Sequence, residues 1–424
     1  MNLTQLYLQK LFQAYYKSHF NDYPAISNLN QREFAFIRWD YPGMQRHIGY
    51  PDKSFLLNYL IKYAPRHSYR SASIYSIPSA DKMENKGYLG CDFVVDIDSD
   101  HIPTSCQHTH NYVMCKNCGK LLIGDKPEEC PDCHNKKFKK VVWICDECLN
   151  ISKEQVHHLI DGFLLKDFNI PLSAIKLNFS GHRGYHVRIE SEVFRALDQE
   201  ERREIADYVT GQGFSYNVWN FKTIQANMVG FTIDQPGWPG KIAYEFYQVL
   251  AKGKNAIQEV FTKPRYGTPI RSNVLHHIID QRLELMHRIE SKNRIWGIPH
   301  VGLATWHRIF EILRDRIKAD IDVVVSIDLH RLIRLEGSIH GKAGLRVVDV
   351  PYDKLDEFDP LVDALTFPQN SPNRLTLKIT APICPPIRIG NKIYDNLIHG
   401  QEYTLPLNVG IFLLCKDVAE LIKN

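Results

Sequence analysis

Apolar and polar residues alternate between Asp92 and Asp98, which is the pattern of a half-buried β-strand. Phe93 and the two apolar residues that follow at every second position point to one face, while Asp96 and Asp98 share the other. At the usual rise of a strand, these two carboxylates lie roughly 6.5 Å apart along the backbone. The alternation therefore predicts a strand that presents a pair of acidic side chains on one face.

Other segments show either this two-residue period or the 3.6-residue period of a helix. Apolar residues near the start (residues 3–15) predict an amphipathic helix, and Asp198 with Glu201 three residues later predicts the beginning of another. The remaining expected elements are helices over about 54–63, 152–165, 274–292, 302–318 and 415–423, and strands over 31–36, 71–77, 175–179 and 321–327. Because strands and helices follow one another without a strict βαβ rhythm, the fold class expected is α/β of the mixed α+β kind.

The composition is that of a globular protein with more than one structural unit: 424 residues, 44% of them hydrophobic and 24% charged. A formal net charge of only +4 means that any nucleic-acid surface must be a local patch. No apolar run is long enough to span a bilayer, and the first residues lack the pattern of a signal peptide. We therefore expect a cytoplasmic protein with no membrane association.

The cysteines are clustered: seven of the ten lie within 43 residues, six of them in Cys-x-x-Cys pairs. In an intracellular protein this clustering indicates metal binding and not disulfides. Two pairs separated by 11 residues have the spacing of a zinc ribbon, and they are Cys115, Cys118, Cys130 and Cys133. We expect structural zinc here, because four protein ligands leave no open position for catalysis.

The other three cysteines of this region, Cys106, Cys145 and Cys148, are one ligand short of a second four-coordinate site. Either His108 or His110, which follow Cys106, completes the set. The assignment of ligands stays open at this point, because His134 or an exchange of cysteines between the two sets is also compatible with the spacing. One or two structural zinc sites are expected.

The paired aspartates have two interpretations. Like charges this close raise each other's pKa unless a cation lies between them, so Asp96 and Asp98 suit a divalent metal site for phosphoryl or nucleotidyl chemistry. Taken alone, an Asp-x-Asp sequence is more often a strand edge whose acidic face points into water.

Two later segments carry candidate phosphate ligands. Ser180–His186 places glycines at a turn between two strands, where backbone N–H groups, Arg183 and His186 could surround a triphosphate; a plain glycine turn is the alternative. Asp320–Lys342 begins with acidic residues and continues with four cations and two glycines, so it could supply a third carboxylate and further phosphate ligands. The alternative for that segment is a strand followed by basic residues that are simply exposed to solvent.

In this order the three segments resemble the small, catalytic subunit of archaeal and eukaryotic replicative DNA primases, most closely the archaeal form. The resemblance covers most of the chain and rests on Arg32-Glu33-Phe34, the paired aspartates, the Ser-Gly-x-Arg-Gly-x-His turn and the Arg-Leu-Ile-Arg-Leu-x-x-Ser-x-His-Gly run. It implies the primase catalytic fold, with a zinc-binding insertion and an additional helical region. Residues 1–100, 150–214 and 320–424 would form the catalytic core, 101–149 the zinc-binding insertion, and 215–319 a largely helical insertion of uncertain role.

The resemblance also implies roles for individual residues. Asp96, Asp98 and Asp322 match its catalytic, metal-binding aspartates, with Mg²⁺ or Mn²⁺ as the ion. The residues that match positions around the incoming nucleotide are Ser180, Arg183, His186, Arg334, His340 and Lys342. Glu33 and Arg46 fall near family positions close to the active site.

By resemblance, the expected function is synthesis of short primers from nucleoside triphosphates on a single-stranded DNA template by two-metal nucleotidyl transfer, in a heterodimer with the primase large subunit. An archaeal source is expected. Two other functions fit parts of the pattern. A non-enzymatic zinc-ribbon protein that binds nucleic acid would not need the aspartates near a phosphate-binding turn, and a metal-dependent nuclease would not need a triphosphate pocket.

Overall fold

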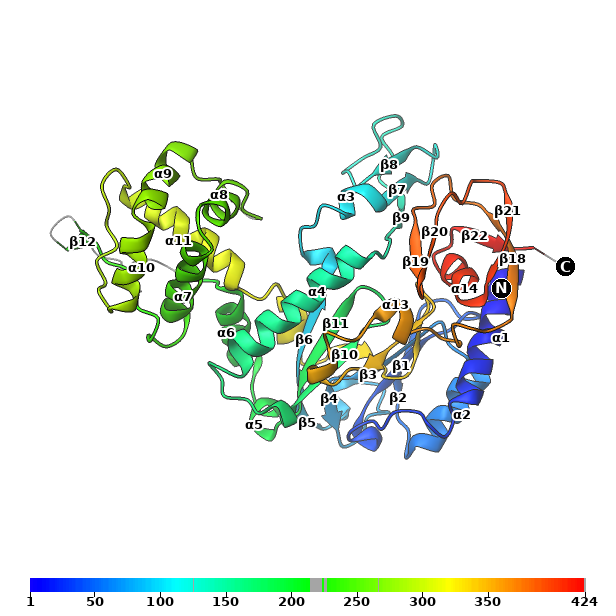
Figure 1. Ribbon diagram of the computed structural model, residues 1–424. Coiled ribbons are helices and arrows are strands. Elements are labelled where there is room, and N and C mark those ends of the chain that lie inside the picture. Colours follow the sequence, from blue (N-terminus) through cyan, green and yellow to red (C-terminus); the bar gives the residue numbers. More distant parts are fainter. Residues whose placement is uncertain (125, 214–222, 225–226, 266, 423–424) are drawn as a thin grey trace. The chain divides into compact units, whose positions relative to one another are not determined.

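The computed structural model describes residues 1–124, 126–213, 223–224, 227–265 and 267–422. The chain divides into two compact units (Figure 1). The first unit comprises Met1–Val156, Leu172–Arg203 and Ile321–Asn424, and the second comprises His157–Pro171 and Glu204–Asp320. The expected boundary between 214 and 215 lies outside the described residues.

Two four-stranded antiparallel sheets form the centre of the first unit. In spatial order the first sheet is β17 (Val348–Asp349), β10 (Ile175–Phe179), β11 (Gly184–Ile189) and β6 (Phe93–Asp98), and the second is β14 (Leu332–Arg334), β3 (His67–Ser71), β1 (Phe34–Ile37) and β2 (Met44–Ile48). Strands β6 and β11 alternate between residues that face the core and residues that face the site described below. Smaller sheets complete the unit. Two have three strands, in the spatial orders β8 (Leu121–Ile123), β7 (Tyr112–Cys115), β9 (Phe138–Val141) and β21 (Glu402–Pro406), β18 (Arg374–Ile379), β22 (Ala419–Leu421). Three are pairs: β4 (Ser73–Tyr75) with β5 (Tyr88–Cys91), β15 (Ile339–His340) with β16 (Leu345–Arg346), and β19 (Ile387–Ile389) with β20 (Lys392–Tyr394).

Helices pack around these sheets. Those of the first unit are α1 (Leu3–Ser18), α2 (Lys53–Tyr63), α3 (Gln107–His110), α5 (Glu192–Arg195), α12 (Val323–Ile327), α13 (Pro360–Asp363) and α14 (Leu407–Cys415). Helix α1 follows the expected amphipathic pattern: Asn2 and Gln5 form a capping box at its start, and Leu8 and Phe12 are buried. Two helices begin in the first unit and end in the second, α4 (Asp146–Leu159) and α6 (Gln199–Thr210).

The second unit is largely helical. It contains α7 (Trp238–Ala251), α8 (Lys254–Thr262), α9 (Ser272–Asp280), α10 (Arg282–Glu290), α11 (Leu303–Ile317) and the strands β12 (Thr223–Ile224) and β13 (Asn227–Met228). Its core is aromatic: the ring of Trp296 lies 5.3 Å from that of Phe246 and 5.6 Å from that of Phe310, measured between centroids. The aromatic core explains why a segment rich in tryptophan and phenylalanine folds as a compact unit.

The mixed α+β fold is confirmed, but the expected strand over 321–327 is wrong. Residues Val323–Ile327 form helix α12, although three consecutive valines favour a strand. The side chain of Asp322 accepts hydrogen bonds from the backbone N–H groups of Val324 and Val325, so it caps the helix. Val325 then packs with Val94 of β6 in a small buried cluster. Capping and packing together outweigh the β preference of valine.

The last expected helix, over 415–423, is also wrong. The helix there is α14, which ends at Cys415, and the chain then forms β22 beside β18. Almost every residue of α14 is buried, so it is apolar on all sides and has no amphipathic period to reveal it. The expected helix over 274–292 is two helices, α9 and α10, and the one over 152–165 begins earlier as α4 and continues as a π-helical turn over Ile160–Leu164.

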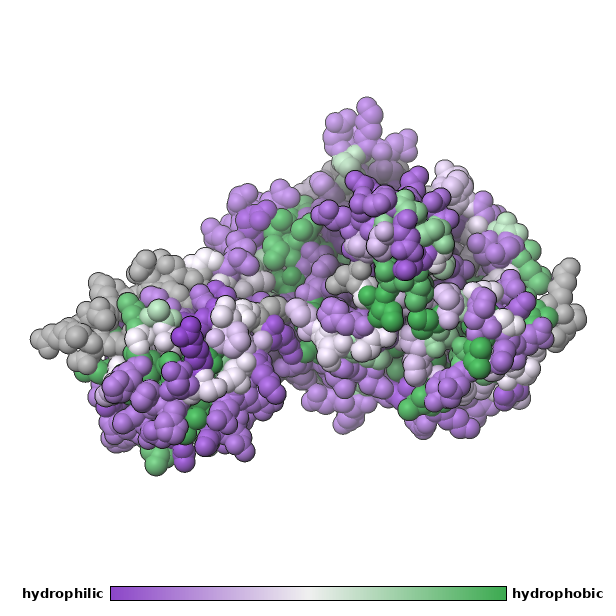
Figure 2. Space-filling model, turned by 90° about the horizontal axis from the view of Figure 1, so that it is seen from above, coloured by the Kyte–Doolittle hydropathy of each residue, from purple (hydrophilic) through white to green (hydrophobic). Residues whose placement is uncertain are grey.

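The surface is mostly hydrophilic on the face shown in Figure 2, with apolar residues in small separate patches. Within the described ranges, no helix combines the length and the apolar character that crossing a membrane requires.

Candidate active site and zinc clusters

The paired aspartates lie on β6 next to β11, as the alternation predicts. In the antiparallel register Asp96 is opposite His186, and Asp98 is opposite Gly184. A Cβ atom on Gly184 would lie 2.1 Å from the carbonyl oxygen of Ile97, so only glycine allows β11 to approach β6 this closely. The acidic pair and the Ser180–His186 turn are therefore neighbours in one sheet (Figure 1).

Asp322 lies beside Asp96 and not among the residues that line the cavity described next, and a backbone contact holds it there. Its N–H group donates a hydrogen bond to the carbonyl oxygen of Asp96 at 2.9 Å, which fixes the start of α12 against β6. Burial, and then the charge of Asp322, raises the pKa of Asp96 to about 6. Two acidic groups from segments more than 200 residues apart thus lie close enough to act on each other electrostatically.

A cavity of about 350 Å³ opens in front of the two aspartates of β6. The expected site residues that line it are Asp96, Asp98, Ser180, His186, Arg334, His340 and Lys342. The cavity is also lined by residues that were not expected there, among them Tyr69, Asp100, Val142, His182, Val325 and Arg331. Acidic side chains on one wall thus face basic side chains on the other.

Hydrogen bonds organise the basic wall around Arg334. One nitrogen of its guanidinium, Nη2, donates to Nε2 of His340 at 2.8 Å, and Nη1 donates to Nδ1 of His67 at 2.7 Å. The guanidinium also lies 4.5 Å from the centre of the Tyr69 ring. Burial, followed by the charge of Arg334, lowers the pKa of both histidines well below the usual range, so both are neutral acceptors at pH 7.

His186 is neutral for the same reason. Burial and the neighbouring Arg334 lower its pKa to about 4, and its Nε2 atom lies 3.6 Å from a carboxylate oxygen of Asp96. Lys342 also has a lowered pKa, first through burial and then through the charge of Arg334. The basic side chains of this wall are therefore Arg331, Arg334 and Lys342.

Arg183 occupies a different place from the other expected phosphate ligands. Its side chain is fully buried behind the acidic strand, where it forms an ion pair with Asp100 and donates to the carbonyl oxygen of Trp143 at 3.3 Å. Asp98 lies 3.8 Å from the same guanidinium. Although burial would raise the pKa of Asp100, Arg183 lowers it below the usual range. In this structure Arg183 pairs with carboxylates of the acidic edge and is not among the residues that line the cavity.

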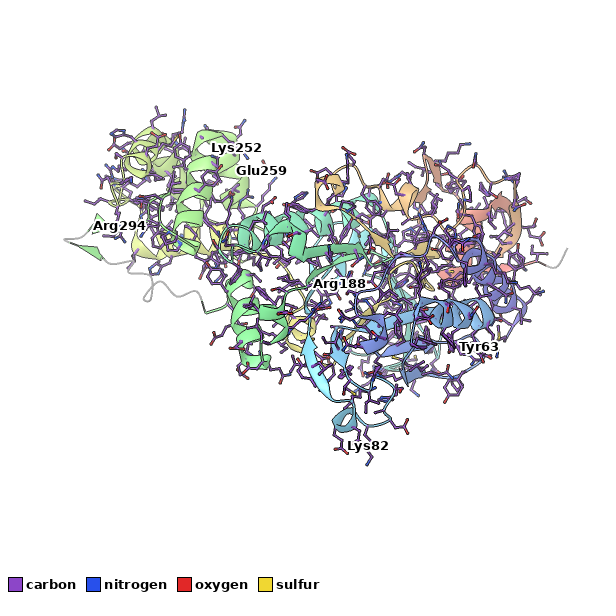
Figure 3. All side chains as sticks on the ribbon, turned by 90° about the horizontal axis from the view of Figure 1, so that it is seen from below. Tyr63, Lys82, Arg188, Lys252, Glu259 and Arg294 are labelled. Carbon is purple, nitrogen blue, oxygen red and sulfur yellow. The ribbon has the colours of Figure 1, made fainter. Side chains whose placement is uncertain are left out.

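A buried carboxylate ties the two central sheets together behind the cavity. Glu336, which follows β14, accepts from Arg70 of β3 at 2.6 Å and from Arg188 of β11 at 2.9 Å. Arg188 is labelled in Figure 3. These ion pairs hold β11 and β3 together, and so position the acidic wall relative to the basic one. Glu33 instead pairs with Arg46 at 2.9 Å, away from the cavity lining.

The cysteine region gathers into two clusters that could bind zinc. Cys115, Cys118, Cys130 and Cys133 form one, with Sγ–Sγ distances of 3.6 Å between Cys115 and Cys133 and between Cys118 and Cys130. Four sulfur atoms about 2.3 Å from a tetrahedral zinc ion are about 3.8 Å apart, so the spacing fits that ion.

The second cluster consists of Cys106, His110, Cys145 and Cys148. Nε2 of His110 lies 3.3 Å from the sulfur atoms of Cys145 and Cys148, whereas His108 lies outside the cluster. The other ring nitrogen, Nδ1, is 3.0 Å from Oδ1 of Asn111, an arrangement that orients metal-binding histidines. The hydrogen bonds from Cys148 and His110 lower the pKa of the Cys145 thiol, which favours the thiolate form that binds metal.

These two clusters are the sets of three or more Cys, His, Asp or Glu residues whose ligand atoms lie within 4.8 Å of one another in the described parts of the chain. The three aspartates are spaced more widely than that. Burial, followed for Asp96 by the charge of Asp322, raises the pKa of Asp96 and Asp98.

Sequence reasoning missed several residues of the site. His182 and Arg331 line the cavity and lie inside segments that the sequence singled out, so those motifs could have indicated them. Tyr69, which lines the cavity, and His67, which holds Arg334, carry no such signal, because β3 reaches the site only through its pairing with β14 in the folded sheet.

A cavity with aspartates on one wall and buried cations on the other is typical of enzymes that transfer phosphoryl or nucleotidyl groups. Comparison with known proteins agrees with that class and narrows it. A family model described as DNA primase small subunit matches residues 128–352. The chain belongs to this family, which makes it a nucleotidyltransferase of DNA replication and confirms the expected resemblance.

Curated relatives match along nearly the whole chain. The DNA primase small subunit PriS of Cenarchaeum symbiosum is 27% identical, with 98% of each chain covered, and that of Nitrosopumilus maritimus is 25% identical, with 99% of this chain and all of the relative covered. The protein of the same name from Thermoplasma volcanium is 31% identical over 84% of this chain and 81% of its own. Family membership sets aside the non-enzymatic zinc-ribbon alternative.

Proposed function

We propose that the chain synthesises primers from nucleoside triphosphates on single-stranded DNA by a two-metal mechanism. The observation that carries this proposal is the shared cavity: Asp96 and Asp98 line it together with Arg334, His340 and Lys342. Neither wall alone specifies the reaction. Carboxylates hold divalent ions, and cations hold phosphates, so a nucleotide with its metal ions needs both.

In the proposed site, Asp96, Asp98 and Asp322 would hold Mg²⁺ or Mn²⁺. Carboxylate oxygens are the ligands that these ions prefer, and the raised pKa of Asp96 is what a carboxylate without a compensating cation would have. The bound ions would lower the pKa of the attacking 3′-hydroxyl and neutralise charge on the triphosphate and departing pyrophosphate.

The basic wall would bind and orient the triphosphate. Arg334 provides a fixed guanidinium, and its bonds to His67 and His340 restrict it to one orientation. Ser180, His186 and Lys342 would add hydrogen-bond donors from the other sides of the cavity, and His340 would act through Arg334, whose guanidinium it holds. Arg183 would act on the nucleotide indirectly, by holding Asp98 and Asp100 in place. A nuclease does not bind a nucleoside triphosphate, so the basic residues that line the cavity favour synthesis.

A partner is also part of the proposal. Membership in a small-subunit family implies a large subunit, and we propose a heterodimer of the two with a single-stranded DNA template. We further propose that both cysteine clusters hold structural zinc, since each already has four ligands.

The test is nucleotide incorporation by an Asp96→Asn variant. Asparagine keeps the size of the side chain but removes the charge that would hold the ion, so synthesis should fall by about 100-fold or more while the fold is retained. Primer extension on single-stranded DNA in Mg²⁺ or Mn²⁺ measures the loss, and circular dichroism checks the fold. Incorporation close to that of the parent protein would reject the assignment. An assay for DNA cleavage in the absence of nucleotides distinguishes a nuclease from a primase.

A further inference from the structure

The ribbon formed by β7, β8 and β9 around the Cys115 cluster is rich in lysine. Residues 114–141 contain seven lysines and four acidic residues. Lys120 and Lys139 form ion pairs with Asp132 and Asp417. Among the described residues, by contrast, Lys126, Lys136 and Lys140 have no carboxylate within the 4.0 Å of an ion pair.

Strand β9 places Phe138 and one of these lysines on one face. Side chains alternate along a strand, so Phe138 and Lys140 form a row on the same side, and Lys136 lies two residues before Phe138, just outside the strand. Lys126 lies above the ring of Phe138, with its Nζ atom 5.9 Å from the ring centre. The lysines are exposed and Phe138 is half-buried, so the face presents three positive charges around an accessible aromatic ring.

The row leads to the cavity of the active site. Val142, two residues after Lys140, lines that cavity together with Asp96 and Asp98. The charge of Lys140 also reaches Asp100, where it supports the stronger effect of Arg183 in lowering the pKa of that carboxyl. Residues two apart in a strand are about 6.6 Å apart, so Phe138 and Lys140 are separated by about that length along β9, which ends one residue before Val142.

We propose that the face made by Lys126, Lys136, Phe138 and Lys140 binds single-stranded nucleic acid and guides the template strand to the cavity. Lysines that pair with backbone phosphates and an aromatic ring that stacks on a base are the usual combination for single strands. An overall charge of only +4 requires such a local patch. The guiding role rests on the proposed template-directed synthesis, whereas binding itself does not.

Binding of a fluorescently labelled oligothymidine to the full-length, zinc-loaded chain, measured by anisotropy without nucleotides, tests the inference. The variant K136A/K140A should bind about tenfold more weakly near 0.1 M salt. The slope of log K against log salt concentration should decrease by about 1.4, which corresponds to two lost phosphate contacts on a single strand.

The matched control is K116A/K137A, which removes the same charge from the other face. Lys116 directly follows β7 and Lys137 directly precedes β9, and a backbone hydrogen bond of 2.9 Å joins them, next to the paired residues Cys115 and Phe138. Each is adjacent in sequence to a residue of that pair, so alternation directs both away from the side of Phe138. The control should bind as the parent does. Equal weakening by both variants, or by neither, would overturn the proposal, because binding would then depend on net charge alone or not on this ribbon.

Two further measurements make the result specific. F138L keeps an apolar side chain but loses the stacking surface, so it should weaken binding to the single strand and leave binding to duplex DNA unchanged. Equal loss of binding to single-stranded and duplex DNA would contradict the assignment to single strands. The same holds if the parent protein binds an acidic peptide as strongly as it binds single-stranded DNA. Zinc content is measured for each variant. If K136A/K140A loses zinc, the variant K136Q/K140Q is tested in its place.

Binding is measured without catalysis. A chain that binds single-stranded DNA but does not synthesise primers would therefore refute the proposed function and not this binding surface.

Discussion

At the scale of single residues, the site depends on histidines that stay uncharged. Nδ1 of His67 accepts hydrogen bonds from Arg334 at 2.7 Å and from the N–H group of Gly341 at 3.3 Å. A proton on that nitrogen would remove both bonds, and burial with the charge of Arg334 already lowers the pKa of His67 well below its usual value. Arg334 therefore stays fixed only while His67 is neutral.

This gives a prediction for stability against pH. In the unfolded chain His67 takes up a proton below about pH 6.5, whereas in the folded chain it does not, so its contribution is present above pH 6.5 and is lost as the pH falls. In a His67→Asn variant, the new amide side chain accepts a hydrogen bond but does not titrate. Relative to this variant, the free energy of unfolding of the parent should fall by about 1.4 kcal/mol between pH 7.5 and 5.5. Denaturant titration at both pH values measures the difference; a constant difference would contradict a neutral His67.

The sequence predicts some of these residues and not others, for physical reasons. Asp96 and Asp98 follow from strand alternation, which is a local property. His67 and Tyr69 act through the pairing of β3 with β14, and the buried position of Arg183 depends on Trp143 and Asp100. Contacts between distant segments leave no periodic signal in a single sequence, so these roles become visible only in the folded sheets.

At the scale of elements, the contact between β6 and β11 controls the acidic edge. Because a Cβ on Gly184 would lie 2.1 Å from the Ile97 carbonyl oxygen, Gly184→Ala should push the strands apart and destabilise the protein by about 1–3 kcal/mol. Gly162→Ala is the control, since a Cβ there meets no atom within 4 Å, and the substitution in a helical turn should leave stability unchanged or raise it by up to about 1 kcal/mol. Thermal unfolding of the two variants gives the comparison; equal effects would argue against close packing at Gly184.

The zinc clusters give a second prediction at this scale. The parent protein should contain about two zinc ions per chain, since each set offers four ligands. His110→Ala should reduce the content to about one, whereas His108→Ala, which changes a residue outside both ligand sets, should leave it at about two. Metal analysis of the purified variants decides this. Loss of metal in the His108 variant and not in the His110 variant would reverse the ligand assignment.

Elements are predicted well where one interaction dominates. The capping box and apolar stripe of α1 are local, and that helix is found as expected. Helices α12 and α14 depend on burial in the tertiary structure: the first packs Val325 against β6, and the second is apolar on all sides. For both, packing against neighbours overrides the preference of the residues themselves.

At the scale of the whole molecule, the order of the motifs carried more information than any one of them. Asp96, the Ser180–His186 turn and Asp322 are far apart in sequence, yet β6, β11 and α12 bring them together. The second, helical unit had no comparable motifs, and its aromatic core explains its fold without indicating a role.

The central claim is that Asp322 joins Asp96 and Asp98 in one ion-binding site. The most direct measurement compares Mn²⁺-dependent primer synthesis on single-stranded DNA by Asp322→Asn and Asp320→Asn variants. Asp320 is two residues away but pairs with Lys318 at 3.1 Å, so it serves as a matched control. We expect the Asp322 variant to lose activity by about 100-fold or more and the Asp320 variant to retain it. Full activity in the Asp322 variant, or equal loss in both, would contradict the three-aspartate site.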